Sequence, residues 1–350
     1  MKESNSKVAV IVPVYNTAKY LAQCLDSLLE QTYKNFTIFA VNDGSTDSSE
    51  LILNKFKEKD SRIIVLNKEN GGAASARNLA LKRIEDEATY RGVCFVDSDD
   101  YVKPRFLELF VTLADKYKAD HVICGWDYFD KTGVVERSST PYITHPTKIL
   151  SQNDTFCHFT QTKEWSKLRS KTLSYGCANL YFSAKIVKGL RFNEDLKRAE
   201  DQEFRMRAIA RIQKCIVSCE INYMYRIRKS SLSHHKNVIL DDLLFSIKLI
   251  EDQQEFSDFG RHTIEHLCIK HWWRCFKAIV ATQPDPLGKE IFKKCSRSLL
   301  EYRKTHPDAN FKTKGVAKLY LYHYAQPILK LFVAVHQKKQ TSHTTQNAYD

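Results

Sequence analysis

The first 124 residues alternate between short apolar runs and segments whose apolar residues recur at helical spacing. Val8–Val12 is continuously apolar, as expected of a strand buried on both faces, whereas Leu21, Leu25 and Leu28 share one face of a helix. Parallel strands need helical crossovers, so the order predicts an α/β fold with a doubly wound, mainly parallel sheet. Further strands are expected at 36–41, 63–66, 92–96 and 121–124, and helices at 47–59, 73–84 and 104–116.

The pattern changes after residue 124. Residues 125–235 mix turns with short apolar runs, and from about Val238 onward the apolar residues return to helical spacing. The last residues are polar, which predicts a disordered tail. We therefore expect a domain over 1–235, with a regular half at 7–130 and an irregular half at 131–235, then a helical region at 236–339 and a tail at 340–350.

Three carboxylates follow the apolar strand that ends at Phe95 and Val96. Alternation along an extended chain would place Asp97 and Asp99 on one face, with Asp100 on the other. Two hard oxygen ligands suit Mg²⁺ or Mn²⁺ that also contacts substrate phosphates, so the cluster predicts a nucleoside diphosphate substrate. We expect Asp99 to bind the metal and Asp97 to bind the metal or ribose hydroxyls, while Asp100 holds the loop.

Ligands of doubly wound sheets bind at the carboxyl ends of the strands, and two further polar clusters lie there. Pro13, Tyr15 and Asn16 end the first strand, where they either cradle a base or form an ordinary turn. Asp43 ends the second strand and could accept a hydrogen bond from N3–H of uracil. Residues 45–47, which follow it, are better placed to cap the next helix.

A third cluster follows the third strand. Gly71 and Gly72 free the backbone there, and a helix of small residues begins after them. A helix N-terminus offers N–H groups to an anion, and Arg77, one turn further, would reach a phosphate. The alternative is a tight loop that lets the helix pack closely on the sheet.

In this order the clusters resemble the inverting nucleotide-sugar glycosyltransferases of family 2, which have the Rossmann-like GT-A fold. The resemblance covers residues 7–130 and is carried by VAVIVPVYNTAKYLAQCLDSLLEQTY, FTIFAVNDGSTDSS, NKENGGAASARNLAL and FVDSDDYVKP. It implies a donor half at 7–130, an acceptor half at 131–235 and a UDP-sugar donor. It also implies that Asp97 and Asp99 hold the ribose and the metal ion, and that the nucleotide pocket is lined by Pro13, Tyr15, Asn16, Asp43, Gly72 and Arg77.

A weaker resemblance continues at Glu200 and Asp201, where this family carries an acidic motif that ends in a phenylalanine, here Phe204. An acceptor hydroxyl must lose its proton as it attacks, and the resemblance assigns that general base to Asp201. Glu200 would then contact the acceptor. The alternative is a solvated helix face whose carboxylates pair with Arg198, Arg205 or Arg207.

Two flanking segments also resemble parts of the family. Where the family often has Trp-x-Lys-Leu-Tyr, this chain has Asn179 in place of the lysine, a change we associate with acceptor specificity. After Tyr225 the chain resembles a loop that folds over the diphosphate, with Arg228 and Ser231 in that role. His234 is either a third metal ligand or an exposed loop histidine.

Charge is concentrated late in the chain. The net charge is +13, and residues 261–339 hold 16 Lys and Arg against 5 Asp and Glu, a net of +11. The segments 271–276 and 314–336 mix these cations with aromatic residues, which suits either a helical pair on an anionic membrane surface or a subdomain packed on the body. A nucleic acid partner is not expected, because we recognise no binding module.

No apolar run approaches the ~20 residues that span a bilayer, and the polar segment Met1–Lys7 leads straight into a strand. We therefore expect no secretory signal and a cytoplasmic protein, peripheral on the inner face of the cell membrane. The ten cysteines lack the paired spacing of a zinc site and are expected to be reduced.

Together these features predict an enzyme that moves a sugar to a hydroxyl of a lipid-linked or surface glycan, such as lipopolysaccharide, capsule or a related polymer. One alternative is a nucleotidyltransferase, which would usually carry an early Gly-rich Arg-Lys loop that residues 13–20 lack. The other is a non-catalytic nucleotide-sugar binding protein, which would be expected to have lost Asp99 or Asp201.

Overall fold

The structure is a computed structural model that describes residues 7–130, 133–135, 147–155, 176–196, 199–227 and 248. The chain divides into two compact units, Met1–His235 and Lys236–Asp350, and all described residues except Lys248 belong to the first. Apart from Lys248, the helical region expected at 236–339 and the tail at 340–350 lie outside the described residues, as do Arg228, Ser231 and His234.

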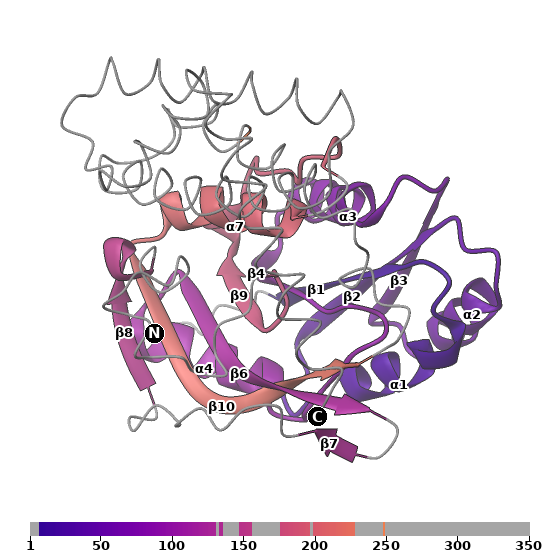
Figure 1. Cartoon of the computed structure of the whole chain (residues 1–350), viewed down its shortest axis with the longest axis horizontal. Helices are drawn as coiled ribbons and strands as arrows, with labels where there is room; N and C mark the ends of the chain where they lie inside the picture. Colours follow the sequence, from indigo (N-terminus) through magenta and orange to yellow (C-terminus); the bar gives the residue numbers. More distant parts are fainter. Residues whose placement is uncertain are drawn as a thin grey trace, which may run out of the picture. The chain divides into compact units, whose positions relative to one another are not determined.

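The first unit is built on one large sheet with helices on both sides (Figure 1). The strand order is β3-β2-β1-β4-β9-β6-β10-β5, with β7 paired to β6 and β8 to β10. The strands are β1 (Lys7–Val14), β2 (Phe36–Asp43), β3 (Ile63–Lys68), β4 (Tyr90–Phe95), β5 (Tyr101–Val102), β6 (His121–Asp130), β7 (Gly133–Val135), β8 (Thr147–Ser151), β9 (Leu180–Ser183) and β10 (Lys214–Arg226). The helices are α1 (Ala18–Leu29), α2 (Ser49–Lys59), α3 (Ala73–Glu87), α4 (Phe106–Tyr117), α6 (Ala184–Val187) and α7 (Glu200–Arg211).

The predicted fold class is confirmed. Strands β3, β2, β1 and β4 are parallel, and each predicted strand and helix up to residue 124 is present within a few residues of its expected bounds. The sheet reverses its order between β1 and β4, where a doubly wound sheet opens its ligand site. The insertion of β9, antiparallel to both β4 and β6, was not predicted.

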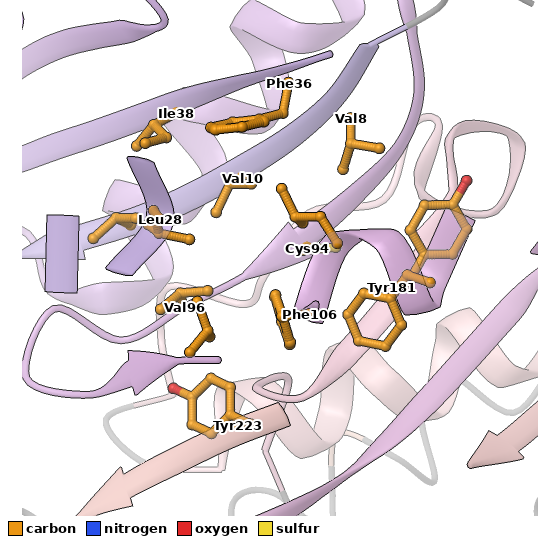
Figure 2. Packing of buried hydrophobic residues seen from close by; sticks show 14 of the residues in the cluster. Val8, Val10, Leu28, Phe36, Ile38, Cys94, Val96, Phe106, Tyr181 and Tyr223 are labelled. Atoms are coloured by element: carbon orange, nitrogen blue, oxygen red, sulfur yellow. The ribbon is translucent and has the colours of Figure 1, made fainter. Parts of the chain in front are cut away.

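The parallel strands are buried on both faces because helices cover both sides. Helices α3 and α7 lie above the sheet in Figure 1, and α1 and α4 contribute to one packed cluster with β1. Val8 and Val10 of β1 pack into one cluster with Leu28 of α1 and Phe106 of α4 (Figure 2). This packing explains why the strands read as continuous apolar runs instead of alternating ones.

Strand β10 is the main element that the pattern did not reveal. It runs parallel to β6 and antiparallel to β5 and β8, and its register shifts between Val217 and Ile221. Gly125 of β6 faces that irregularity: a Cβ there would lie 2.9 Å from the carbonyl oxygen of Cys219. Strand β10 matters for the site because its last residues reach the acidic turn that follows β4.

A side chain at Gly92 of β4 is expected to destabilise the sheet beneath the site. A Cβ at this position would overlap with the buried ring of Tyr181 on β9. Gly92→Ala should therefore lower the free energy of unfolding by about 1–3 kcal/mol through overpacking. Urea unfolding measures the loss, and Tyr181→Ala in the same chain should make the double variant less destabilised than the sum of the single changes. Strict additivity would contradict this contact.

Candidate functional site

The acidic residues after β4 form a turn instead of continuing the strand. Strand β4 ends at Phe95, and the Asp100 N–H donates to the Asp97 carbonyl over 3.0 Å. The chain is no longer extended there, but the expected division is still seen in burial, with Asp97 and Asp99 on the more open side and Ser98 and Asp100 on the buried side. Asp97 and Asp99 are half-buried, whereas Asp100 is 1% exposed.

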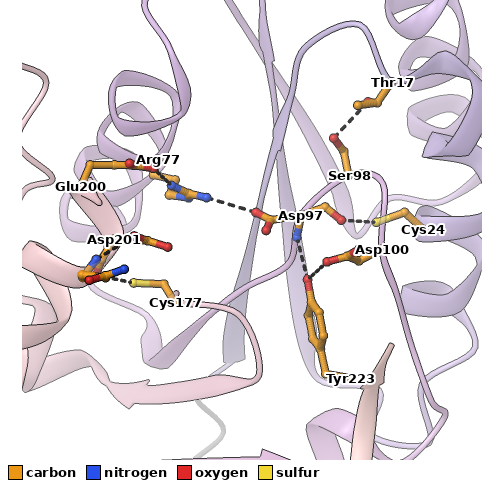
Figure 3. Close-up of polar contacts among 11 residues, drawn as sticks. Thr17, Cys24, Arg77, Asp97, Ser98, Asp100, Cys177, Glu200, Asp201 and Tyr223 are labelled. Atoms are coloured by element: carbon orange, nitrogen blue, oxygen red, sulfur yellow. Dashed lines mark hydrogen bonds and ion pairs between the residues drawn. The ribbon is translucent and has the colours of Figure 1, made fainter. Parts of the chain in front are cut away.

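Asp100 anchors the turn to β10. Its carboxylate accepts hydrogen bonds from the Tyr223 hydroxyl at 2.6 Å and from the Arg226 N–H at 2.8 Å, and the Tyr223 hydroxyl accepts one from the Asp97 N–H (Figure 3). Burial raises the pKa of Asp100 well above its usual value, with Asp99 and Asp97 adding to the effect. This agrees with the expectation that Asp100 holds the loop.

Arg226 is a second residue that anchors the acidic turn to β10. The sequence analysis did not predict it and named Arg228 as the arginine of this segment. Its Nε donates to the Asp99 carbonyl over 2.6 Å, and its guanidinium lies 4.6 Å from the ring centroid of Tyr20 and 4.3 Å from that of Phe129. A cation between two aromatic faces is well placed and partly desolvated. It therefore brings a fixed positive charge close to the turn.

Arg77 joins the turn to helix α7. The side chain is 8% exposed, and its guanidinium forms ion pairs with Asp97 at 3.1 Å and with Glu200 at 3.0 Å (Figure 3). Burial acts against the charge of Arg77, but the carboxylates Asp97, Glu200 and Asp201 outweigh it and raise the pKa. The structure thus brings together four predicted site residues, and Arg77 binds carboxylates on both sides.

Stacked aromatic side chains hold α7 in this place. Phe204 of α7 lies parallel to Phe192 with ring centroids 4.0 Å apart, and Phe95 at the end of β4 contacts both edge-on. The side-chain amide of Asn78 on α3 binds the segment before α7. It donates to the Phe192 carbonyl over 2.9 Å and accepts from the Phe192 N–H over 2.7 Å. The first turn of α7 is therefore fixed against the end of β4.

Asp201 lies in that first turn. Its carboxylate accepts a hydrogen bond from the Gln202 N–H at 2.7 Å. Burial raises its pKa to about 7, Glu200 adds to the rise, and Arg77 opposes it. The alternative was a solvated helix face on which Glu200 and Asp201 pair with nearby arginines. Arg207 does not support it, because its side chain pairs with Glu203 at 2.5 Å.

The ends of β1, β2 and β3 carry the remaining predicted donor residues. Asp43 is buried and accepts hydrogen bonds from the N–H groups of Gly71 at 3.0 Å and Gly72 at 2.8 Å. Asn16 accepts one from the Thr46 N–H at 2.8 Å, so its side chain ties the ends of β1 and β2 together. Tyr15 is 49% exposed beside them. Pro13 is half-buried within β1.

Two further sequence hypotheses are resolved by burial. Asn179 is fully buried with a φ of 56°, and its amide donates to the Cys124 carbonyl at 2.5 Å. It therefore supports the sheet, and the structure gives no basis for a direct contact with an acceptor. The cysteines that the structure describes are free, and the expected reduced state of all ten stays a prediction.

The carboxylates at the turn fit a metal only in company with a substrate. No group of three or more His, Cys, Asp or Glu side chains that could hold a metal ion occurs among the described residues. Asp97 and Asp99 are two half-buried oxygen donors, and Mg²⁺ is commonly bound by one or two carboxylates together with substrate phosphates. The donor set therefore suits a metal that arrives with a diphosphate.

Comparison with known proteins identifies the family. The model of glycosyl transferase family 2 matches residues 9–188, just over half of the 350-residue chain. The chain belongs to this family. Family membership disfavours the alternative of a nucleotidyltransferase, and the expected resemblance is confirmed.

Two of the similar curated proteins are much longer than this chain. Glycosyltransferase GlyA of Streptococcus pneumoniae serotype 4 (strain ATCC BAA-334 / TIGR4) is 34% identical over 65% of this chain and 32% of its own length. The minor teichoic acid biosynthesis protein GgaB of Bacillus subtilis (strain 168) is 28% identical over 92% of this chain and 35% of its own length. The family 2 chain thus spans about a third of the length of each.

Solved structures show the same fold. TarS 1–349 of S. aureus in complex with UDP superposes with a TM-score of 0.66 and 22% identity, over 90% of this chain and 86% of that one. The mannosyltransferase PcManGT from Pyrobaculum calidifontis, in complex with GDP-Man and Mn²⁺, gives a TM-score of 0.52 at 18% identity, over 92% of this chain and 88% of that one.

In the part of the family 2 chain that the structure describes, no helix is both long and apolar enough to cross a membrane.

The raised pKa of Asp201 predicts a pH-dependent stability. Between pH 4 and 7 the folded state keeps a proton that the unfolded state releases, so stability falls as pH rises through this window. The loss is at most a few kcal/mol, since one pKa unit corresponds to ~1.4 kcal/mol. Asp201→Asn removes this titrating group and so the pH-dependent loss. The free energy of unfolding of the variant, measured in urea, should therefore rise relative to that of the wild type between pH 5 and pH 8.

Asp195→Asn is the matched control for this prediction, because it makes the same change at an exposed carboxylate. An equal stability difference between Asp201→Asn and the wild type at both pH values would show that the pKa of Asp201 is not raised.

Proposed function

We propose that this protein transfers a sugar from a UDP-sugar to a hydroxyl of a surface glycan, with inversion at the anomeric carbon. The observation that carries the proposal is the Arg77 bridge, which sets Glu200 and Asp201 of α7 beside Asp97 at the end of β4. A donor group and an acceptor group must meet within a few ångströms for a single displacement. Family 2 membership supports the reaction class.

Asp201 serves as the general base. An acceptor hydroxyl has a pKa far above 7 and must give up its proton as its oxygen attacks the anomeric carbon. A carboxylate whose pKa is about 7 holds a proton more firmly than an exposed one, and a substantial fraction of it is charged and ready to accept a proton near neutral pH. Glu200, fixed by Arg77, contacts the acceptor.

The donor lies across the ends of β1, β2 and β4. Tyr15 packs against the base, Asp43 and Gly72 contact the nucleotide, and Asp97 binds the ribose. Asp99, assisted by Asp97, would hold Mn²⁺ or Mg²⁺, which neutralises charge on the departing diphosphate when bound. The buried charge of Arg77 adds a fixed positive field at the same place.

The proposed acceptor rests on the chemistry of the site and on the names of similar proteins. GgaB is named for teichoic acid biosynthesis, and TarS binds UDP in a structure with the same fold. The name of GgaB supports a polymer of the cell surface as acceptor, and the UDP bound to TarS supports a UDP-sugar as donor. We extend the acceptor class to lipopolysaccharide and capsule. The basic segment 261–339 would hold the protein on an anionic membrane surface where lipid-linked acceptors reside.

Release of the nucleotide tests the reaction class. The purified protein, incubated with Mn²⁺, a panel of UDP-sugars and a glycan acceptor, should release free UDP. Asp201→Asn should lower the rate by about 10²–10⁴-fold because the base is lost, while calorimetric UDP binding stays near that of the wild type.

Asp195→Asn should release UDP at the wild-type rate, because its carboxylate is exposed and on no site element. Pyrophosphate release would favour a nucleotidyltransferase, and binding without any product would favour a non-catalytic protein. Weakened UDP binding in Asp201→Asn would move that residue out of the base role.

Asp99→Ala tests the metal assignment. Titration of UDP with and without Mn²⁺ should show a metal-dependent gain in affinity for the wild type and little gain for the variant, because the variant lacks the oxygen donor. The Asp99 backbone carbonyl remains to accept from Arg226, so the turn should keep its anchor. An unchanged metal dependence would contradict the assignment.

A further inference from the structure

Strand β10 contacts the acidic turn at several points. The Tyr223 hydroxyl accepts a hydrogen bond from the Asp97 N–H over 3.2 Å and donates one to the Asp100 carboxylate over 2.6 Å (Figure 3). Three residues further along β10, the Arg226 Nε donates to the Asp99 carbonyl over 2.6 Å. Two side chains of one strand therefore hold the turn at its first, third and fourth residues.

The Tyr223 side chain is itself locked by the core around it. It is 1% exposed, and its ring centroid lies 6.1 Å from that of Phe106 on α4 (Figure 2). The Tyr223 backbone pairs with Val102 of β5, the short strand that follows the turn. Since a close-packed interior resists displacement, the hydroxyl is a fixed point against which the turn is set.

The Arg226 side chain is also held in place. Its guanidinium lies over the rings of Tyr20 and Phe129 and donates a hydrogen bond to the side-chain oxygen of Gln23. A guanidinium on aromatic faces gains cation–π energy that it would lose by moving away. The Asp99 carbonyl is therefore tied to a second fixed group.

The bonds from Tyr223 and Arg226 to the two proposed metal ligands use backbone groups. They reach the N–H of Asp97 and the carbonyl of Asp99, so they fix where each side chain starts without occupying its carboxylate oxygens. Mg²⁺ demands near-ideal octahedral geometry, and a ligand set works only when it is held to within about 0.5 Å. A shift of the turn backbone would therefore weaken metal binding while both carboxylates remained present.

We propose that Tyr223 and Arg226 are positioning residues, which set the affinity for a metal–nucleotide complex by fixing the backbone of the acidic turn. This rests on the proposed function, in which Asp99 and Asp97 hold the metal, and extends it from the ligands to the residues that place them. Groups that support metal ligands in this way typically contribute about 10–100-fold in metal affinity.

Tyr223→Phe tests the first contact, because it removes the hydroxyl and keeps the ring. Calorimetric titration of the full chain with UDP, with and without Mn²⁺, should show that the metal-dependent gain in UDP affinity falls about tenfold or more. UDP affinity without metal should change little, because the proposed base contacts at Tyr15, Asp43 and Gly72 lie on other loops. Electron paramagnetic resonance of Mn²⁺ at saturating UDP measures the metal affinity directly.

Tyr181→Phe is the matched control. Tyr181 is also 1% exposed, and its hydroxyl donates to the Arg91 carbonyl over 3.2 Å near the start of β4, at the opposite end of that strand from the turn. This variant loses a buried hydroxyl of the same kind, so urea unfolding should show both variants destabilised. Only Tyr223→Phe should lose the metal-dependent gain, which a purely structural role would not produce.

Arg226→Met tests the second contact, and charge alone predicts the opposite result. Removal of a cation near a metal ion would strengthen Mn²⁺ binding through the lost repulsion. Positioning predicts weaker Mn²⁺ binding at saturating UDP, because the Asp99 carbonyl loses its donor. This variant decides the matter if Tyr223→Phe does not fold.

The outcomes separate this inference from the proposed function. An unchanged metal-dependent gain in folded Tyr223→Phe, an equal fall in Tyr181→Phe, or unchanged or tighter Mn²⁺ binding in Arg226→Met would overturn the positioning role and leave the transferase proposal standing. A wild type that binds UDP without any effect of Mn²⁺ would overturn the metal assignment together with this inference. Failure of the wild type to bind UDP at all would overturn the proposed function as well.

Discussion

The arrangement of the site depends on the guanidinium of Arg77. It forms ion pairs with Asp97 after β4 and with Glu200 at the start of α7, residues 20 and 123 positions away along the chain. A buried charge is tolerated only when it is paired, so the two carboxylates are held where Arg77 can meet both. The donor side and the acceptor side of the proposed reaction thus share one cation.

Negative charge at the site exceeds the fixed positive charge around it. Arg77 compensates Asp97, Glu200 and in part Asp201, while Arg226 approaches the turn through the Asp99 carbonyl. Burial and the excess of negative charge together raise the pKa values of Asp100 and Asp201. A diphosphate would therefore need a metal ion to enter a place where negative charge is already in excess, and Asp201 would keep the proton affinity that a base requires.

Rigidity comes from apolar contacts beneath these charges. The stacked rings of Phe192 and Phe204 rest on Phe95, and the Tyr223 hydroxyl ties the turn to β10. The end of β4 is therefore held by one element on each side, α7 through aromatic packing and β10 through hydrogen bonds. Such support from below fixes the positions of the polar groups at the strand ends before a ligand arrives.

The sequence by itself determined the alternating strands and helices up to residue 124, because each is specified by local periodicity. It also determined that Asp43, Asp97 and Asp99 lie at strand ends, and it placed Glu200 and Asp201 on a helix. Only the tertiary structure decided that the residues after Phe95 turn, since the bond that closes the turn to Tyr223 comes from a distant strand. Strand β10 was not predicted because Ser218, Glu220 and Asn222 interrupt its apolar run. The Arg77–Glu200 and Asp43–Lys68 ion pairs could not be predicted either, because periodicity carries no information on which distant side chains meet.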